Sequence, residues 1–173
     1  MADQENTLHM DIATAKDEPK GRVTIALRPD LAPNHVARIK ELAREGFYDG
    51  VVFHRVIDGF MAQGGDGQHG NSTSPNFNPG RAGTGGSSKP NLKQEFSSEP
   101  HVRGVCSMAR AQSPDSANSQ FFICFGDATF LDRQYTVWGK VTDGMEIIDG
   151  IKRGEPVREP DKIAKLQVAA DGE

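Results

Sequence analysis

The chain has 173 residues, a length typical of a single domain. Its 20 Lys and Arg against 24 Asp and Glu give a formal net charge of −4, which argues against a nucleic-acid partner. No apolar run approaches the roughly 18 residues of a membrane span. The N-terminus has no basic segment followed by an apolar one, so we expect a cytoplasmic protein without membrane contact.

Two short segments near the N-terminus predict half-buried strands. Apolar and polar residues alternate over 8–13 and again over 23–27. The polar stretch between them contains Pro19 and predicts a hairpin loop. Residues 1–6 show no such pattern, and we expect them to form a flexible N-terminus.

Residues 31–46 predict a helix. Pro33 fits the first turn, where a missing N–H costs little, and Gly46 fits the position just past the helix end. His35 lies near the start, and we interpret it as an exposed helix residue. The apolar residues recur at helical spacing: Val36, Ile39, Leu42 and Ala43.

Residues 48–66 predict a β-hairpin, because Asp58-Gly59 stands between two β-prone apolar segments. A two-residue loop would pair Arg55 with Ala62, whereas a three-residue loop would pair Arg55 with Gln63. The choice reverses which side chains share a face, since side chains alternate along a strand. The pattern alone leaves both registers open. In either register, a guanidinium among apolar residues needs a partner or a ligand.

A long polar segment covers residues 64–92. It is rich in Gly, Ser, Asn and Pro and has no usable periodicity, which in a compact domain is typical of a functional or mobile loop. Residues 65–70 match the spacing of a dinucleotide-binding glycine motif. That motif requires a helix immediately after it, and the sequence that follows is not helical, so we predict no phosphate site.

The second half of the chain predicts four further strands and one short helix. The strands are expected over 105–109, 119–125, 135–141 and 163–169, and the helix over 144–152. Because the two helices do not alternate with the strands, the pattern favours an antiparallel barrel or sandwich over a parallel sheet. Cys106 and Cys124 lie in apolar strand-like runs, and we interpret them as reduced core thiols.

The sequence offers little equipment for covalent or metal chemistry. There is no Gly-x-Ser-x-Gly elbow, and the five histidines and two cysteines show no metal-ligand spacing. We therefore expect no cofactor and no metal. Apolar and aromatic residues gather instead near Arg55, Gln63 and Gln120, a composition that suits the binding of a peptide-like ligand.

Three blocks in order resemble the signatures of the cyclophilin-type peptidyl-prolyl cis-trans isomerases. They lie in residues 48–66, which include Phe53-His54-Arg55, in 107–123 and in 130–141, and the resemblance extends over roughly residues 7–168. It implies a mainly β fold, a closed eight-stranded antiparallel β-barrel capped by two α-helices, as one domain over 1–173. It also favours the three-residue hairpin loop, because the family places its arginine and glutamine together.

The resemblance implies an isomerase that accelerates rotation about Xaa-Pro bonds during protein folding. Its partners would be proline-containing polypeptides, and we expect it to act as a monomer. Arg55 would be catalytic, by hydrogen bonding to the proline nitrogen of the twisted amide. The residues implied to line the substrate groove are Phe60, Met61, Gln63, Ala109, Arg110, Gln120, Phe122, Phe130, Leu131 and Tyr135.

The sequence departs from the family pattern at several places. Phe130 stands where the family often has the Trp associated with cyclosporin, so we expect weakened cyclosporin affinity. Tyr135 and Arg110 stand where many members have His and Asn. Residues 68–82 resemble an insertion of bacterial members, whose role the sequence leaves open. The alternative is a non-catalytic proline-peptide binding module of the same fold, against which the presence of Arg55 argues.

Overall fold

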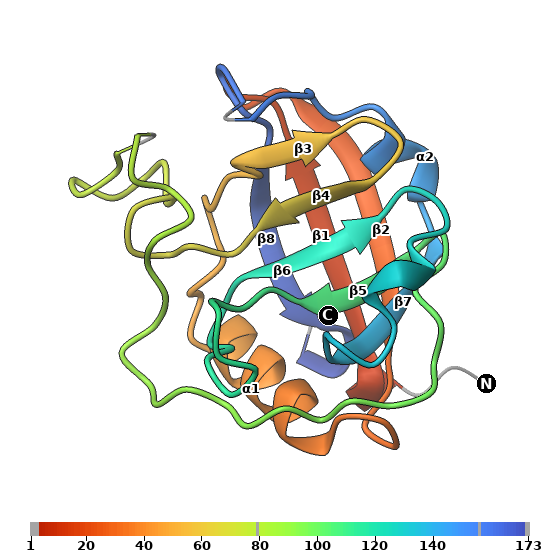
Figure 1. Cartoon of the computed structure of the whole chain (residues 1–173). Helices are drawn as coiled ribbons and strands as arrows, with labels where there is room; N and C mark the ends of the chain where they lie inside the picture. The colour runs from red at the N-terminus through yellow and green to blue at the C-terminus, as the bar shows by residue number, and fades with distance from the viewer. Residues whose placement is uncertain (1–3, 79, 156, 172–173) are drawn as a thin grey trace.

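The computed structural model describes residues 4–78, 80–155 and 157–171. Eight strands form one antiparallel sheet in the order β3-β4-β6-β5-β7-β2-β1-β8 (Figure 1). The strands are β1 (Thr7–Ala13), β2 (Pro19–Leu27), β3 (Arg55–Ile57), β4 (Met61–Gly64), β5 (Val105–Met108), β6 (Phe121–Cys124), β7 (Val137–Asp143) and β8 (Lys162–Val168). The helices are α1 (Pro33–Arg44) and α2 (Met145–Asp149), with 3₁₀ turns η1 (Gln4–Asn6), η2 (Thr129–Leu131) and η3 (Ala169–Asp171).

The sheet curls so that β3, β4, β6 and β5 lie in front of β8, β1, β2 and β7 (Figure 1). The main core fills the space between these two halves. It combines Met10 and Ile25 from one half with Phe121 and Ile123 from the other, and Trp138 is also buried within it. Because side chains alternate along each strand, these residues point into the core and their neighbours in sequence point to the outer face of the sheet.

The predicted closed barrel is wrong, because the sheet is an open half-barrel. β3 and β8 are its two end strands and share no ladder. The segment before β3 contacts β8 instead, through an isolated bridge between Val52 and Lys162 and backbone hydrogen bonds of 2.7 to 3.0 Å between residues 50–53 and 161–163. β3 is three residues long, and its outer edge is occupied by Gly154, which exchanges two 2.8 Å hydrogen bonds with Val56. That edge is therefore not available to β8.

Helix α1 confirms the helical pattern and its end signals. Pro33 occupies the first turn, and Gly46 has φ +73° just past the helix end. Gly46 N–H donates to the Ala43 carbonyl at 3.1 Å, and Phe47 N–H donates to the Leu42 carbonyl at 3.0 Å. This pair of bonds is the Schellman arrangement, which needs a left-handed residue and so favours glycine. None of the described helices is long and apolar enough to cross a membrane.

The prediction that His35 is an exposed helix residue is wrong. Its side chain is fully buried, and Nδ1 lies 2.6 Å from Oε1 of Glu95. The same carboxylate accepts the backbone N–H groups of Asn34 and His35 at 3.1 and 2.9 Å. Ala32, at the N-cap, has no side chain that could do this. A carboxylate distant in sequence therefore caps α1 and covers His35.

The two cysteines are free and buried, which confirms their interpretation as reduced core thiols. Cys106 belongs to the main core between the sheet halves, and Cys124 belongs to a second apolar cluster. Burial raises the pKa of the Cys124 thiol to about 12 and that of Cys106 well above its usual value. Neither thiol is therefore activated as a nucleophile.

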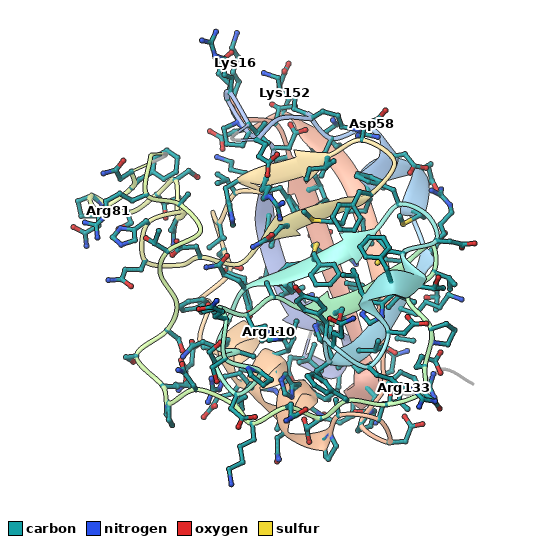
Figure 2. All side chains as sticks on the ribbon, viewed as in Figure 1. Lys16, Asp58, Arg81, Arg110, Arg133 and Lys152 are labelled. Carbon is teal, nitrogen blue, oxygen red and sulfur yellow. The ribbon has the colours of Figure 1, made fainter. Side chains whose placement is uncertain are left out.

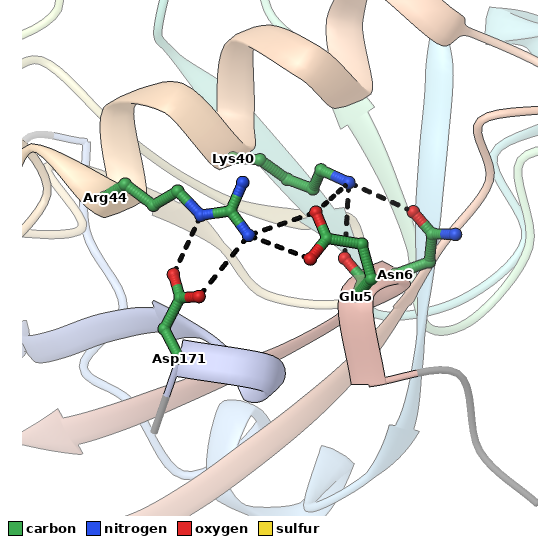
Figure 3. Close-up of polar contacts among 5 residues, drawn as sticks. All are labelled: Glu5, Asn6, Lys40, Arg44 and Asp171. Carbon is green, nitrogen blue, oxygen red and sulfur yellow. Dashed lines mark hydrogen bonds and ion pairs between the residues drawn. The ribbon is translucent and has the colours of Figure 1, made fainter. Parts of the chain in front are cut away.

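Residues 4–6 of the N-terminus form the turn η1, and residues 1–3 lie outside the described residues; the expected flexibility stays a prediction. η1 is tied to α1 and to η3 by a polar cluster (Figure 3). Arg44 donates from Nη2 to Glu5 at 2.9 Å and from Nε to Asp171 at 2.8 Å. Lys40 adds an ion pair of 2.8 Å to Glu5. One helix thus fastens both ends of the described chain.

Candidate active site

The β3–β4 hairpin has the three-residue loop that the family resemblance favours. Arg55 pairs with Gln63 and Ile57 pairs with Met61, so residues 58–60 form the loop. Gly59 has φ +74°, as such loops require of one residue. In this register Arg55 and Gln63 are cross-strand neighbours on one face, and their side chains meet.

A pocket of about 170 Å³ lies on the outer face of the front half of the sheet. It is built on the second apolar cluster, which includes Met61, Phe122, Leu131 and Tyr135. Nine of the eleven residues predicted for the site line it. They are Arg55, Phe60, Met61, Gln63, Ala109, Arg110, Phe122, Leu131 and Tyr135.

The floor of this pocket is aromatic. Phe122 is 5 % exposed and meets the ring of Tyr135 edge to face, with centroids 5.6 Å apart. The guanidinium of Arg110 lies 4.7 Å above the Tyr135 ring. Its nitrogens also donate to backbone carbonyls, including that of Gln134 at 2.8 Å, so the side chain is tied down as part of the wall. The pocket is thus preformed.

Phe122 rests on a buried polar chain that the sequence did not reveal. The ring of His101 stacks against Phe122, its Nδ1 lies 3.0 Å from Asp132, and its Nε2 lies 2.9 Å from the hydroxyl of Ser107. The residue types are those of a hydrolase triad, but Ser107 is fully buried and donates to the Thr136 carbonyl. A substrate cannot reach this hydroxyl. The chain supports Phe122 from behind and supplies no nucleophile.

The remaining two predicted residues lie beside the pocket. Phe130 is 66 % exposed and packs against Phe60 at the rim, with ring centroids 5.5 Å apart. The weakened cyclosporin affinity expected from Phe130 stays a prediction. Gln120 lines a second, larger cavity of about 340 Å³, which shares Gln63, Ala109 and Arg110 with the first. The two cavities therefore form one continuous groove.

Gln63 and Gln120 connect Arg55 to the long loop through a chain of hydrogen bonds, in which each side chain donates to the next. We call this chain the relay. Gln120 Nε2 donates to the carbonyls of Gly83 and Gly85, each at 2.9 Å. Its Oε1 then accepts from Gln63 Nε2 at 3.1 Å, and Gln63 Oε1 accepts from Arg55 Nη1 at 3.2 Å. Because the carbonyls accept only, they fix which way each amide points. The relay holds one side of the guanidinium.

Asp66 holds the loop at the far end of this relay. It is fully buried, and its carboxylate accepts four backbone N–H groups at 2.8 to 2.9 Å, two of them from Gly83 and Gly85. Burial alone would raise the pKa of Asp66, but the four donors together outweigh it and lower the pKa. This turn also accounts for the glycine spacing that matched a dinucleotide motif. A Cβ on Gly67 would lie 2.4 Å from the Phe47 ring.

The insertion, described over residues 68–78 and 80–82, projects from the body of the molecule, with Arg81 on its outer side (Figure 2). Its base is tied to the body where Val51 bridges Asn71 and where Val52 N–H donates to the Gly70 carbonyl at 2.9 Å. The expectation of a long polar loop is therefore met, and the part that follows the insertion, residues 83–87, forms one wall of the groove.

Glu155 contacts Arg55 on the side opposite Gln63. Its Oε2 lies 2.6 Å from Arg55 Nε, and Arg55 remains 39 % exposed. Glu155 lies 100 residues from Arg55 and in no recognisable motif, so nothing in the sequence indicated this contact. Over the described ranges, no group of three or more His, Cys, Asp or Glu side chains could hold a metal ion.

An antiparallel half-barrel that carries an aromatic groove on its outer face, with Arg55 in that groove, defines the protein class of the cyclophilins. Comparison with known protein sequences supports this class. The family profile described as cyclophilin type peptidyl-prolyl cis-trans isomerase/CLD matches residues 9–168. A probable peptidyl-prolyl cis-trans isomerase of Brucella suis is 56% identical over 175 residues, covering 98% of this chain and 86% of that protein.

Solved structures show the same fold. Cyclophilin AquaCyp293 from Hirschia baltica superposes with a TM-score of 0.82 at 28% identity, covering 99% of this chain and 77% of that one. A cyclophilin-type isomerase of Cryptosporidium parvum gives a TM-score of 0.76 at 23% identity, over 94% of this chain and 98% of that one. The chain belongs to the cyclophilin-type peptidyl-prolyl cis-trans isomerase family, and it is a peptidyl-prolyl cis-trans isomerase.

Proposed function

We propose that the groove binds a proline-containing polypeptide and that Arg55 accelerates rotation about the Xaa-Pro bond without a covalent step. The observation that carries this proposal is the position of Arg55, whose charged donors line the same pocket as Phe60, Met61, Phe122 and Leu131. Met61, Phe122 and Leu131 would receive the proline ring. The structure of the Cryptosporidium parvum protein was determined in the presence of the dipeptide Ala-Pro, which supports a proline ligand for this fold.

The chemistry requires stabilisation of a twisted amide. Resonance gives the planar peptide bond a rotation barrier of about 18–20 kcal/mol. As the bond twists, the proline nitrogen becomes pyramidal and gains a lone pair that the planar amide lacks. A guanidinium N–H can donate to this lone pair only in the twisted state. Such differential binding lowers the barrier without tightening the ground state, and each tenfold acceleration requires about 1.4 kcal/mol.

The two cavities would bind different parts of the substrate polypeptide. The apolar pocket would fix the proline ring, and the polar cavity between residues 83–87 and 116–120 would hold the residues on the other side of the bond. Because the groove is preformed, one side of the amide is held while the other turns. Binding energy is thereby used to hold the Xaa-Pro bond in the geometry in which it rotates.

The test is cis–trans exchange in a short Xaa-Pro peptide, measured by NMR exchange spectroscopy with and without the protein. We expect Arg55→Ala to lower kcat/KM roughly 100-fold, the loss typical when one transition-state hydrogen-bond donor is removed. Arg55→Lys is the matched control, because it keeps the charge but loses the planar fork, and we expect it to remain slow.

Two outcomes would count against this function. A wild-type protein that binds the peptide without accelerating exchange would be the non-catalytic binding module considered as the alternative. An active wild type with a fully active Arg55→Ala variant would leave the enzyme intact and remove the role of Arg55. Circular dichroism of each variant separates either result from loss of the fold.

A further inference from the structure

Residues 153–155 lie along the outer edge of β3. Val56 N–H donates to the Gly154 carbonyl and Gly154 N–H donates to the Val56 carbonyl, both at 2.8 Å. This antiparallel bridge places Glu155 directly opposite Arg55. On the other side of β3, Gln63 also lies opposite Arg55. Arg55 therefore has a polar cross-strand neighbour on each side, and directly opposed side chains interact.

These two neighbours hold different nitrogens of the guanidinium. Glu155 Oε2 lies 2.6 Å from Nε, and Gln63 Oε1 accepts from Nη1 at 3.2 Å. Within the described part of the chain, Nη2 makes no hydrogen bond. Two contacts at separate atoms fix the plane of a rigid group. The nitrogen left over is the donor available to a ligand in the pocket that Arg55 lines.

Glu155 stands on an anchored segment. Arg153, two residues before Glu155, donates from Nη1 to the carbonyls of Asp149 and Ile151, each at 2.7 Å. Its guanidinium lies 4.4 Å above the ring of Phe125, and its Nε donates to Asp58 at 3.1 Å. Since Asp58 belongs to the β3–β4 loop, the segment and the hairpin are joined at three consecutive points: by Arg153, by Gly154 and by Glu155.

The ion pair is poorly placed to stabilise the fold. Glu155 is 58 % exposed and Arg55 is 39 % exposed. Pairs between exposed side chains contribute little to stability, because water screens the charges and the long side chains lose freedom. The short contact between Glu155 and Arg55 Nε is therefore better explained by an effect on the groove than by stabilisation of the fold. An ion pair can orient the donors of Arg55 even when it contributes little to the free energy of unfolding.

We propose that Glu155 is a positioning residue for Arg55, holding the guanidinium so that its free nitrogen faces the proline nitrogen of the substrate. This inference rests on the proposed function of Arg55 and adds to it a residue from the other end of the chain. Glu155 does not line the apolar pocket. Glu155 acts through Arg55. Its loss should therefore lower the rate of cis–trans exchange more than it weakens binding of the peptide.

The experiment compares Glu155→Leu, which removes the acceptor, with Glu155→Gln, which keeps an acceptor and removes the charge. Misplacement of a catalytic group by about 1 Å costs up to about 100-fold, and we expect Glu155→Leu to lower kcat about tenfold with KM unchanged. Glu155→Gln should recover most of that loss. Glu146→Leu, at another exposed carboxylate, is the matched control and should stay fully active.

A readout independent of turnover is the Arg55 Nε–Hε NMR resonance. We expect it to be sharp and shifted in the wild type, nearly retained in Glu155→Gln, and displaced or broadened in Glu155→Leu. An unchanged resonance and unchanged kcat in Glu155→Leu would overturn the positioning role. So would an equal further loss when Glu155→Leu is added to Arg55→Ala, because the residues would then act independently.

These outcomes are distinct from failure of the proposed function. A wild type without any acceleration of exchange overturns the function itself and the positioning role with it. An active wild type whose Glu155→Leu variant keeps full kcat overturns only the role of Glu155. Thermal unfolding of each variant should change little, which excludes a fold defect as the cause of a lower kcat.

Discussion

At the scale of single residues, the groove depends on how its polar atoms are oriented. Arg55 alone could adopt many rotamers, but Glu155 and Gln63 restrict it from two sides. Gln63 is itself oriented by Gln120, whose amide is fixed by two glycine carbonyls. Hydrogen bonds in such a chain reinforce one another. The consequence is that residues outside the apolar pocket influence its arginine.

Gln120 tests this consequence. In Gln120→Leu the carbonyls of Gly83 and Gly85 lose their donor, and Gln63 loses the acceptor that orients its amide. We expect kcat/KM in the peptide exchange assay to fall about tenfold, equivalent to about 1.4 kcal/mol of transition-state stabilisation.

Gln120→Glu is the matched variant for that test. Glutamate still accepts from Gln63 but cannot donate to the two glycine carbonyls, so we expect a loss of similar size. If Gln120→Leu has wild-type kcat/KM, the relay does not orient Arg55 during turnover.

The sequence could predict part of this site and not the rest. Arg55, Gln63 and the aromatic residues were identified because they lie in short blocks that resemble a family signature. The direction of the amides could not be predicted, since it depends on contacts with Gly83 and Gly85, 37 and 35 residues from Gln120. Glu155 was missed for the same reason. A strand edge brings it to Arg55, and nothing in the local pattern indicates which segment covers that edge.

At the scale of secondary-structure elements, α1 shows how a distant side chain completes a local structure. The helix starts at Pro33 after Ala32, and its free N–H groups are satisfied by Glu95. The apolar spacing and Gly46 were sufficient to predict the helix and its end. Its cap could not be predicted, and with it the burial of His35 was missed.

Glu95→Ala should therefore destabilise the protein. Loss of a helix cap costs about 0.5–2 kcal/mol, and we expect a value near the upper end because the carboxylate also contacts buried His35. The measurement is the free energy of unfolding in urea. Glu99→Ala is the matched control, since Glu99 lies nearby in sequence and makes a half-buried 3.5 Å pair with Arg28, away from the start of α1. Equal destabilisation by both changes would argue against a capping role.

The strands were predicted from alternation, and their errors have simple physical causes. Pro19 was predicted to lie in a loop, but β2 begins at this residue. Proline is tolerated at the first residue of a strand, because its missing N–H interrupts no ladder there. The closed barrel was inferred from resemblance. Closure depends on whether two distant edges pair, and here Gly154 occupies the edge of β3.

At the scale of the whole molecule, one curled sheet separates two environments. Its inner face holds the main core, and the outer face of β4, β5 and β6 carries the groove. Three histidines are buried in the molecule: His35, His54 and His101. Burial disfavours the charged imidazolium and lowers the pKa of each of these histidines below its usual value of 6.5.

Nearby carboxylates oppose this effect without cancelling it. Glu95 raises the pKa of His35, Asp66 raises that of His54 and Asp132 raises that of His101, but burial is the largest cause in each case. In the unfolded chain the same histidines are solvated and titrate near their usual pKa of about 6.5. Between the folded and unfolded pKa values, the unfolded chain thus binds more protons than the folded protein.

Stability should therefore depend on pH in a defined direction. Where the unfolded state binds more protons, the free energy of unfolding rises with pH. We expect full stability above about pH 6.5 and a progressive loss as the pH falls below the unfolded pKa toward the lower folded values, with each unit of pKa depression contributing about 1.4 kcal/mol. Urea unfolding at intervals from pH 8 to 5 measures this slope, and NMR titration of the imidazole protons assigns it to individual histidines. A free energy of unfolding that is constant over this range, or that increases toward pH 5, would show that the buried histidines do not hold their neutral form in the folded protein.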